Sequence, residues 1–276
     1  MFLTARVTID HYENFPVASI LLPAHLRRPV ELIYRFARSA DDFADEGDRP
    51  DHERLMLLAS YGDELRMIER GERSRVPLFQ ELGPVIKQHK LPVQLLHDLL
   101  SAFAQDVSKK RYADHSDVLD YCRRSANPVG RLLLHLYDAA TPQNLRHSDN
   151  ICSALQIINF LQDVSIDYRI GRIYLPQDEL ARFGVEERLI TTGKVNDGWR
   201  SFMTFQANRT RRMLLDGAPL GRALKGRIGL EMRMIIAGGD RILSKIAGVR
   251  YNVLRYRPVL RAWDWPLMLL RTLSLK

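Results

Sequence analysis

The sequence has few cysteines and no long apolar run. Its 276 residues include two cysteines, Cys122 and Cys152, which are too few for a disulfide scaffold or a four-cysteine zinc site. No stretch of about 18 uncharged apolar residues is present, so no membrane-spanning helix is predicted. The opening MFLTARVTIDHYENFP lacks the apolar core of a signal peptide. These absences predict a cytoplasmic protein whose thiols are reduced.

The sequence also lacks a dinucleotide-binding motif and features that mark a domain boundary. No G-x-G-x-x-G follows a predicted strand, which leaves no sign of a dinucleotide-binding unit. No Ser/Gly-rich linker, low-complexity tract or internal repeat divides the chain. We therefore predict a single domain over residues 1–276.

The composition is that of a globular protein with a basic surface. Hydrophobic residues make up 46% and charged residues 27% of the chain, enough for a large core. Lys and Arg number 41 against 33 Asp and Glu, a net charge of +8 that attracts anions. Nucleic acid, an anionic membrane and a phosphorylated small molecule all fit this charge. The basic residues are dispersed and form no known nucleic-acid motif, so no nucleic-acid partner is predicted.

Apolar residues recur at spacings of three and four along most of the chain, which predicts an all-α fold. Gly and Pro positions place helices at 29–46, 50–70, from about 92, from about 116, 148–171, 197–215, 222–247 and from about 258. The tail at 257–276 is basic and contains an apolar cluster: Trp263, Trp265, Leu267, Met268, Leu269 and Leu270. It suits either an interfacial helix on a membrane or packing against the body of the protein.

Two of the predicted helices carry polar stripes inside apolar surroundings. Because a helix advances about 100° per residue, each stripe occupies one narrow face. The stripes are Tyr34, Arg38, Asp41 and Asp45 in the first helix and Gln156, Asn159, Asp163 and Asp167 in the second. Each places carboxylates four residues apart, where they repel unless a cation lies between them. The alternative is two solvated acidic patches.

Carboxylate pairs of this kind suit Mg²⁺, which binds carboxylate oxygen together with phosphate oxygen. If the two helices face each other across a bundle, the stripes would hold Mg²⁺ ions and, through them, a diphosphate. Arg38 and Asn159 would donate hydrogen bonds to that diphosphate. The predicted metal ligands are Asp41, Asp45, Asp163 and Asp167, with Asn159 and Asp42 as further candidates.

Three segments carry a resemblance to a known family: RSADDFAD at 38–45, YCRRSANPVG at 121–130 and NFLQDVSIDYRIGRIYLP at 159–176. They resemble the squalene and phytoene synthases, which join isoprenoids head to head. The opening HYENFPVAS and the glutamine of NFLQD are most similar to the bacterial hydroxysqualene synthase branch of hopanoid biosynthesis. The resemblance implies an isoprenoid-synthase helical bundle with a central cavity for the prenyl chain.

The resemblance also implies roles for individual residues. The four stripe aspartates match the family's Mg²⁺–diphosphate ligands, and Tyr121 matches a cavity tyrosine implicated in proton handling. A packed aromatic ring with a satisfied hydroxyl is the alternative for Tyr121. The residues expected to bind substrate near the diphosphate are Tyr34, Arg38, Gln156, Asn159, Arg172 and Tyr174.

Three positions depart from the family pattern. Gln162 stands where condensing relatives have an arginine, Glu13 stands where dehydrosqualene synthases have a lysine, and Gly239 stands where relatives often have a tyrosine. Two cations that could hold a second diphosphate are thus absent. These departures favour presqualene diphosphate, which carries one diphosphate, over two molecules of farnesyl diphosphate.

We therefore predict a hydroxysqualene synthase, a carbon–oxygen lyase. Mg²⁺ would assist ionisation of presqualene diphosphate, and water would capture the rearranged cation to give hydroxysqualene and diphosphate. No NADPH is expected, and an upstream presqualene diphosphate synthase is the expected partner, with location in the cytoplasm or on the inner face of the membrane. Alternatives are a squalene or phytoene synthase that condenses two prenyl diphosphates, and a non-catalytic prenyl-lipid-binding subunit.

Overall fold

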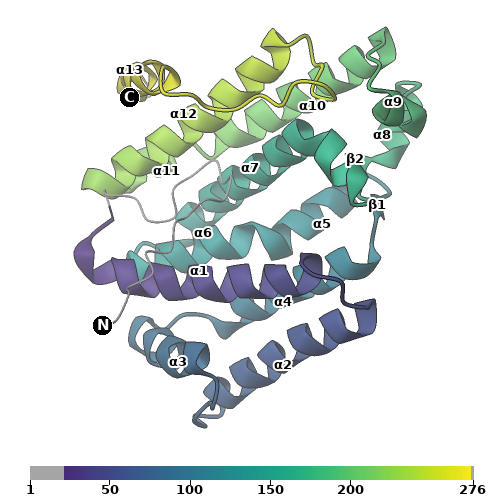
Figure 1. Cartoon of the computed structure of the whole chain (residues 1–276). Coiled ribbons are helices and arrows are strands. Elements are labelled where there is room, and N and C mark those ends of the chain that lie inside the picture. The colour runs from purple at the N-terminus through teal and green to yellow at the C-terminus, as the bar shows by residue number, and fades with distance from the viewer. Residues whose placement is uncertain (1–21, 275–276) are drawn as a thin grey trace, which may run out of the picture.

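The computed structural model describes residues 22–274, with residues 271, 273 and 274 described by backbone alone. Glu13 and the HYENFPVAS segment therefore lie outside the described residues. Helices dominate the fold, as predicted (Figure 1). The first four are α1 (Ala24–Asp45), α2 (Asp51–Glu69), α3 (Pro77–His89) and α4 (Val93–Ser108).

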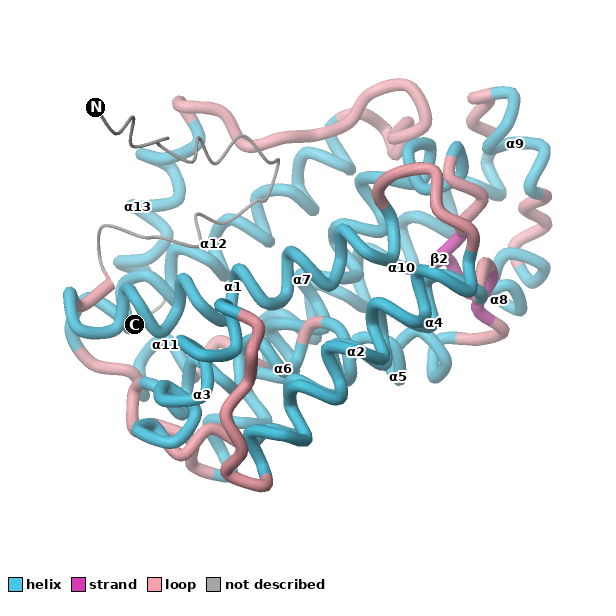
Figure 2. Tube along the Cα trace, turned by 60° about the horizontal axis from the view of Figure 1, so that its bottom comes forward, coloured by secondary structure: helices cyan, strands magenta, loops and turns pink. Residues whose placement is uncertain are grey.

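The rest of the described chain adds nine helices and two very short strands. The helices are α5 (His115–Ser125), α6 (Asn127–Leu136), α7 (Pro142–Arg169), α8 (Gln177–Arg182), α9 (Glu187–Thr192), α10 (Asp197–Asp216), α11 (Leu220–Ala223), α12 (Gly226–Gly248) and α13 (Asp264–Ser274). Strands β1 (Arg111–Tyr112) and β2 (Ile173–Pro176) pair in parallel. They form the single small sheet within residues 22–274, which Figure 2 shows in magenta. The sequence analysis did not predict these strands, because two to four residues are too few to show an alternating pattern.

Several predicted helix starts were wrong. Helix α1 begins five residues before Pro29, directly after Pro23, and contains Pro29. Helix α7 begins at Pro142, because the Thr141 side chain accepts the Asn144 N–H at 3.2 Å and caps the helix there. Helix α13 begins at Asp264 rather than near 258. The segment before it is irregular and runs back along α12 (Figure 2).

The buried side chains form two clusters that share helices. One cluster lies among α1, α2, α3 and α4 and includes Phe36, Leu65 and Phe79. The other surrounds α7, α10 and α12 and includes Trp199 and Phe202. Helices α4 and α6 contribute to both clusters, so they join the two layers that Figure 1 shows above and below α1.

Two glycines allow neighbouring helices to approach α7 closely. A Cβ at Gly130 would lie 2.3 Å from the Ser148 hydroxyl oxygen, so α6 can pack against α7 only with glycine here. A Cβ at Gly239 on α12 would lie 3.0 Å from a methyl of Leu155 and 3.2 Å from one of Ile158. A tyrosine at 239 would not fit this packing. The departure at Gly239 therefore reflects how tightly α12 packs on α7.

The turn after α7 brings two predicted site residues to the end of α4. Gly171 has φ +81°, a left-handed conformation that glycine adopts readily, and it reverses the chain after α7. The next backbone N–H, from Arg172, bonds the carbonyl of Asp167 at 2.9 Å. Strand β2 then pairs with β1, which follows α4. Arg172 and Tyr174 are thereby placed beside α4 and the two acidic helices.

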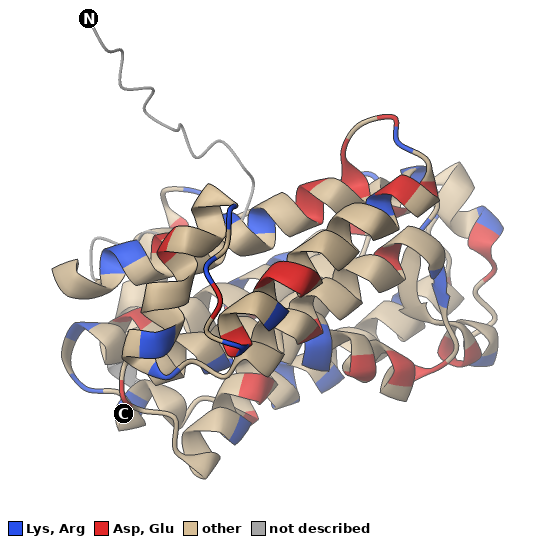
Figure 3. Ribbon diagram, turned by 90° about the horizontal axis from the view of Figure 1, so that it is seen from below, with Lys and Arg blue, Asp and Glu red and all other residues tan. Residues whose placement is uncertain are grey.

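The surface charge is mixed over much of the molecule. The face in Figure 3 intersperses acidic and basic residues, without one block of a single sign. Among residues 22–274, no helix is both long enough and apolar enough to cross a bilayer.

Candidate active site

The first acidic stripe lies on the second half of α1 and is organised by one arginine. Arg38 pairs with Asp42 at 2.7 Å, with Glu46 at 2.7 Å and with Asp41 at 3.3 Å. One guanidinium thus offsets the repulsion among three carboxylates, of which the Asp41 side chain is 38% exposed. Arg38 does not bridge Asp41 and Asp45, the two carboxylates between which the sequence predicted a cation, because Asp45 pairs with Arg172.

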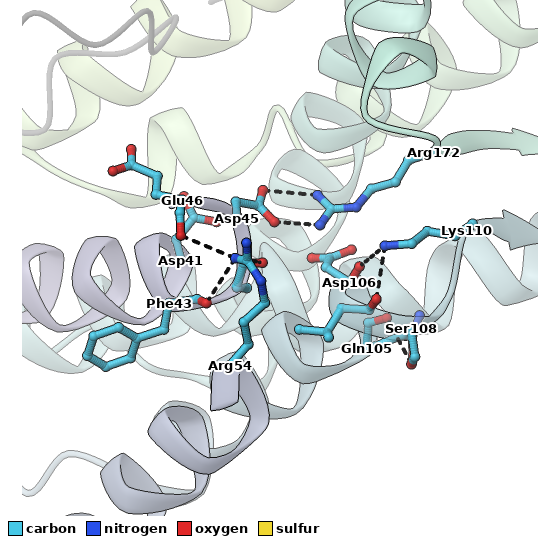
Figure 4. A network of polar contacts seen from close by, with 12 residues as sticks. Asp41, Phe43, Asp45, Glu46, Arg54, Gln105, Asp106, Ser108, Lys110 and Arg172 are labelled. Atoms are coloured by element: carbon cyan, nitrogen blue, oxygen red, sulfur yellow. Dashed lines mark hydrogen bonds and ion pairs between the residues drawn. The ribbon is translucent and has the colours of Figure 1, made fainter. Parts of the chain in front are cut away.

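The end of α1 is fixed by a second arginine, which contacts backbone alone. Arg54 of α2 donates to the carbonyl of Phe43 at 3.3 Å (Figure 4). It also donates to the carbonyl of Ala44 at 2.7 Å and to that of Gly47 at 2.6 Å. Cationic side chains stabilise the last carbonyls of a helix, which carry partial negative charge. The aspartates of α1 are therefore held on a rigid helix end.

Asp45 links α1 to the segment after α7. Its carboxylate forms a two-point ion pair with Arg172, one contact being 3.0 Å between Nη1 and Oδ2 (Figure 4). The Arg172 side chain is 8% exposed. An arginine fork bound to a carboxylate has the geometry that also binds a phosphate. Asp45 and Arg172, 127 positions apart in sequence, thus form one unit.

The second acidic stripe, on α7, meets the segment between α12 and α13. Arg257 forms a two-point ion pair with Asp163, one contact being 2.9 Å between Nη2 and Oδ2. Gln162 is 1% exposed and donates its side-chain N–H to the carbonyl of Pro258 at 2.7 Å. Gln162 therefore anchors this segment on α7. The segment in turn supplies a cation to the aspartate beside Gln162, which the sequence analysis did not predict.

Burial and mutual repulsion make two of the stripe aspartates weak acids. Burial, and after it the charge of Asp45, raise the pKa of Asp41 to about 7, although the charge of Arg38 opposes the rise. Burial and the charge of Asp163 raise the pKa of Asp167 to about 8. Asp45, on the other helix, also raises the pKa of Asp167, and Arg172 lowers it. The two stripes therefore act on each other electrostatically.

The donor set fits Mg²⁺ bridged by a phosphorylated substrate. Within residues 22–274, no group of three or more His, Cys, Asp or Glu side chains is arranged to hold a metal ion by itself. Mg²⁺ usually keeps several waters and binds one or two carboxylates together with phosphates, so a pair of carboxylates per ion is sufficient. Asp41 with Asp45, and Asp163 with Asp167, supply two such pairs. The raised pKa values of Asp41 and Asp167 mean that the protein disfavours their charged forms, and a bound cation would stabilise those charged forms.

A buried carboxylate that sequence analysis missed lies beside the stripes. Asp106 of α4 is 4% exposed and accepts the hydroxyl of Tyr121 at 2.6 Å and that of Tyr174 at 3.0 Å. The Tyr174 ring stacks on Phe160, with centroids 3.9 Å apart. Burial raises the pKa of Asp106 to about 6, although both hydroxyls and Arg172 oppose the rise. The available signal was a carboxylate on the apolar face of a predicted helix, four residues after Ala102 and seven after Leu99, both of which are buried.

The structure places the other predicted residues on the same elements. Tyr34 and Gln156 are half-buried on α1 and α7, and Asn159 lies one turn before Asp163. Tyr121 is both a packed ring and a donor to Asp106, so its hydroxyl is satisfied as the alternative interpretation required. The predicted site residues thus lie along α1 and α7, on α5, and on β2 with the residue before it.

The raised pKa values predict how stability changes with pH. A carboxyl that is a weaker acid in the folded state binds a proton that the unfolded chain has lost, so its contribution to stability decreases as pH rises from about 4 toward 8. Without divalent cations, Asp41→Asn and Asp167→Asn should melt at higher temperature than wild type at about pH 8.5, with less difference at about pH 5. Thermal melts of the three proteins at both pH values test this. An equal difference at both pH values would contradict the raised pKa values.

Comparison with known proteins gives consistent matches. The family model described as squalene/phytoene synthase matches residues 9–264. A hydroxysqualene synthase of Rhodopseudomonas palustris is 38% identical over 240 residues, covering 85% of this chain and 79% of that protein. A hydroxysqualene synthase of Zymomonas mobilis is 35% identical over 230 residues, covering 81% and 75%. The crystal structure of a squalene synthase from Alicyclobacillus acidocaldarius aligns with a TM-score of 0.81 and 34% identity, covering 88% of this chain and 90% of that one.

Proposed function

Because this chain belongs to the squalene/phytoene synthase family, we propose that it is a hydroxysqualene synthase that converts presqualene diphosphate and water to hydroxysqualene and diphosphate. The observation that carries the proposal is the pair of acidic stripes, each already engaged by an arginine, in a chain similar to hydroxysqualene synthases. We also propose that the helical bundle has a central cavity that holds the prenyl chain.

In this reaction the carbon–oxygen bond to the diphosphate breaks, and the diphosphate leaves with the electron pair. When bound, Mg²⁺ would neutralise the charge that develops on the departing oxygens. Asp41, Asp45, Asp163 and Asp167 would hold the metal. Arg172, whose carboxylate partner Asp45 is a proposed metal ligand, and Arg38, which contacts Asp41, would bind phosphate oxygens.

The rearranged cation is captured by water, whose oxygen forms the new carbon–oxygen bond and whose proton is lost to a base. We propose that Tyr121 is one of the aromatic side chains that surround the cation. We propose that Asp106 positions the hydroxyl of Tyr121. Asp106 holds the hydroxyls of Tyr121 and Tyr174 in fixed directions, since each donates to a different oxygen of one buried carboxylate. The stacked rings of Phe160 and Tyr174 present π faces, which stabilise positive charge.

The nearest alternative is a synthase that condenses two prenyl diphosphates. It is favoured by Arg257, which brings a cation to the position beside Gln162, and by the solved relative being a squalene synthase. Gln162 favours presqualene diphosphate, because it is turned to the backbone of Pro258 and carries no charge. An upstream presqualene diphosphate synthase that supplies the substrate follows from the proposed reaction.

The decisive experiment is incubation with presqualene diphosphate and Mg²⁺, without NADPH, followed by mass analysis of the lipid. Hydroxysqualene is the expected product, and its oxygen should derive from labelled water. Farnesyl diphosphate alone should yield no presqualene diphosphate. Efficient condensation of farnesyl diphosphate would replace the proposal by the squalene or phytoene synthase alternative, and absence of diphosphate release from either substrate would favour a non-catalytic lipid-binding protein.

A further inference from the structure

Helix α13 presents an apolar face away from the protein. Its buried positions, Asp264, Met268 and Thr272, are four residues apart and line the side of α13 that packs on α12. Every exposed side chain from 265 to 270 is apolar. The large ones are Trp265, 48% exposed, Leu267, 47%, Leu269, 51%, and Leu270, 64%. A surface of adjacent large apolar side chains is unusual on a soluble monomer and marks an interaction site.

The helix is held so that this face stays outward. Asp264 is 0% exposed, accepts the Nε–H of Arg241 at 2.7 Å, forms an ion pair with Lys245 and accepts the backbone N–H of Arg261 at 2.7 Å. Lys245 also donates to the carbonyl of Val259 at 2.7 Å. These contacts fix the start of α13 on α12 (Figure 1). The contacts of Asp264 therefore hold α13 in an orientation that leaves its apolar side chains exposed.

The net charge of the protein is concentrated in the same region. Residues 241–276 contain eight Lys or Arg and one acidic residue, Asp264, a net charge of +7 out of +8 for the chain. The preceding 240 residues are thus nearly neutral, at +1. Asp264 is buried and paired, so it offers no negative charge to a partner. Arg241 and Lys245 pair with Asp264 and Arg257 pairs with Asp163, and the remaining basic residues favour a partner with negative charge.

Aromatic and cationic side chains meet at the edge of the apolar face. Trp263 is 60% exposed, with the Arg261 guanidinium 5.0 Å and the Lys245 ammonium 5.9 Å from its ring centroid. Indole rings prefer the boundary between hydrocarbon and water, and neighbouring cations there contact anionic headgroups. Trp263 and Arg261 thus suit the headgroup level of a bilayer.

We propose that α13 docks the protein on an anionic lipid bilayer, lying in the interface with Trp265, Leu269 and Leu270 toward the hydrocarbon and the basic residues at the headgroups. A second copy of the chain fits less well, because a self-contact through this face would bring two strongly basic segments together. Under the function proposed above, docking would hold the enzyme where its C30 lipids dissolve. The docking itself does not depend on that function.

The test is binding of the full chain to vesicles of phosphatidylglycerol mixed with phosphatidylcholine, compared with phosphatidylcholine alone and measured by sedimentation. The docking variant is Trp265→Asn with Leu269→Gln and Leu270→Gln, which leaves the buried contacts of α13 intact. The control variant is Leu55→Gln with Met56→Gln on α2, whose side chains are 40% and 60% exposed. Melting temperatures establish that both variants are folded.

Wild type and control should bind anionic vesicles equally. The docking variant should bind them at least about tenfold more weakly. Zwitterionic vesicles or high salt should weaken wild-type binding. Tryptophan emission gives a second measurement, since Trp199 is 0% exposed and Trp263 and Trp265 are the other two tryptophans. A blue shift on adding anionic vesicles is therefore expected. Equal binding by the docking variant, no vesicle binding by wild type, or a wild-type dimer that the docking variant abolishes would overturn the proposal.

Discussion

An Asp41→Asn variant is expected to release diphosphate roughly 10²-fold more slowly than wild type, or not measurably. Asparagine keeps the shape of the side chain but removes a negative charge that would hold Mg²⁺ against the departing diphosphate. The fold should survive, because the Asp41 side chain is 38% exposed and the charge of Asp45 opposes its ionisation. A melting temperature equal to or above that of wild type is expected. Diphosphate release from presqualene diphosphate is the measurement.

Two companion variants sharpen this result. Asp163→Asn should be equally inactive, since Asp163 belongs to the opposite stripe, although it also loses its ion pair with Arg257. Asp63→Asn on α2 is the control, because its side chain is 70% exposed and pairs with Arg66 on the same helix. The control should retain wild-type activity. Near-normal diphosphate release by Asp41→Asn would show that the α1 stripe is not a metal site.

The second large effect is expected from Asp106→Asn. Both Tyr121 and Tyr174 donate hydroxyl protons to Asp106, whereas an asparagine offers one acceptor oxygen and one donor amide. One of the two hydroxyls therefore loses the acceptor for its proton. We expect kcat to decrease by about 10–10² with little change in KM, because the Asp106 side chain bonds the two tyrosines and is not among the carboxylates proposed to hold Mg²⁺. Stability should decrease by about 1–3 kcal/mol, the usual cost of a buried group left without its partner.

Asp98→Asn on the same helix is the matched control. Asp98 is less buried, accepts a hydrogen bond from Gln94 and lies two turns before Asp106. Asp98→Asn should leave kcat and melting temperature near wild type. Tyr121→Phe should reproduce much of the kcat loss, and adding it to Asp106→Asn should cost little more, since the two residues act as one unit. Fully additive losses, or a rise in KM alone, would contradict a positioning role for Asp106.

The acidic stripes could be read from the sequence because they depend on local geometry alone. Positions 41 and 45, and 163 and 167, are one helical turn apart wherever the helices lie. The same local rule located most of the helices. It failed at their starts, where Thr141 capping and the tolerance of Pro29 inside α1 decided the boundary. It also missed α3, which contains the helix breakers Gly83 and Pro84. The short helices and strands carry too few residues for a periodic signal.

The sequence by itself determined the helical class of this protein, the two carboxylate stripes and the family, since each depends on residue spacing along one helix or on short motifs. Tertiary structure alone decided which arginine meets which stripe: Arg172 reaches Asp45 across 127 positions and Arg257 reaches Asp163 across 94. It also decided that Asp106 joins Tyr121 to Tyr174, because that contact requires α4, α5 and β2 to pack together. Likewise, the apolar side chains of α13 are outward because Asp264 is bound to α12. Long-range contacts of this kind arise from how helices pack, and residue spacing along a single helix does not predict them.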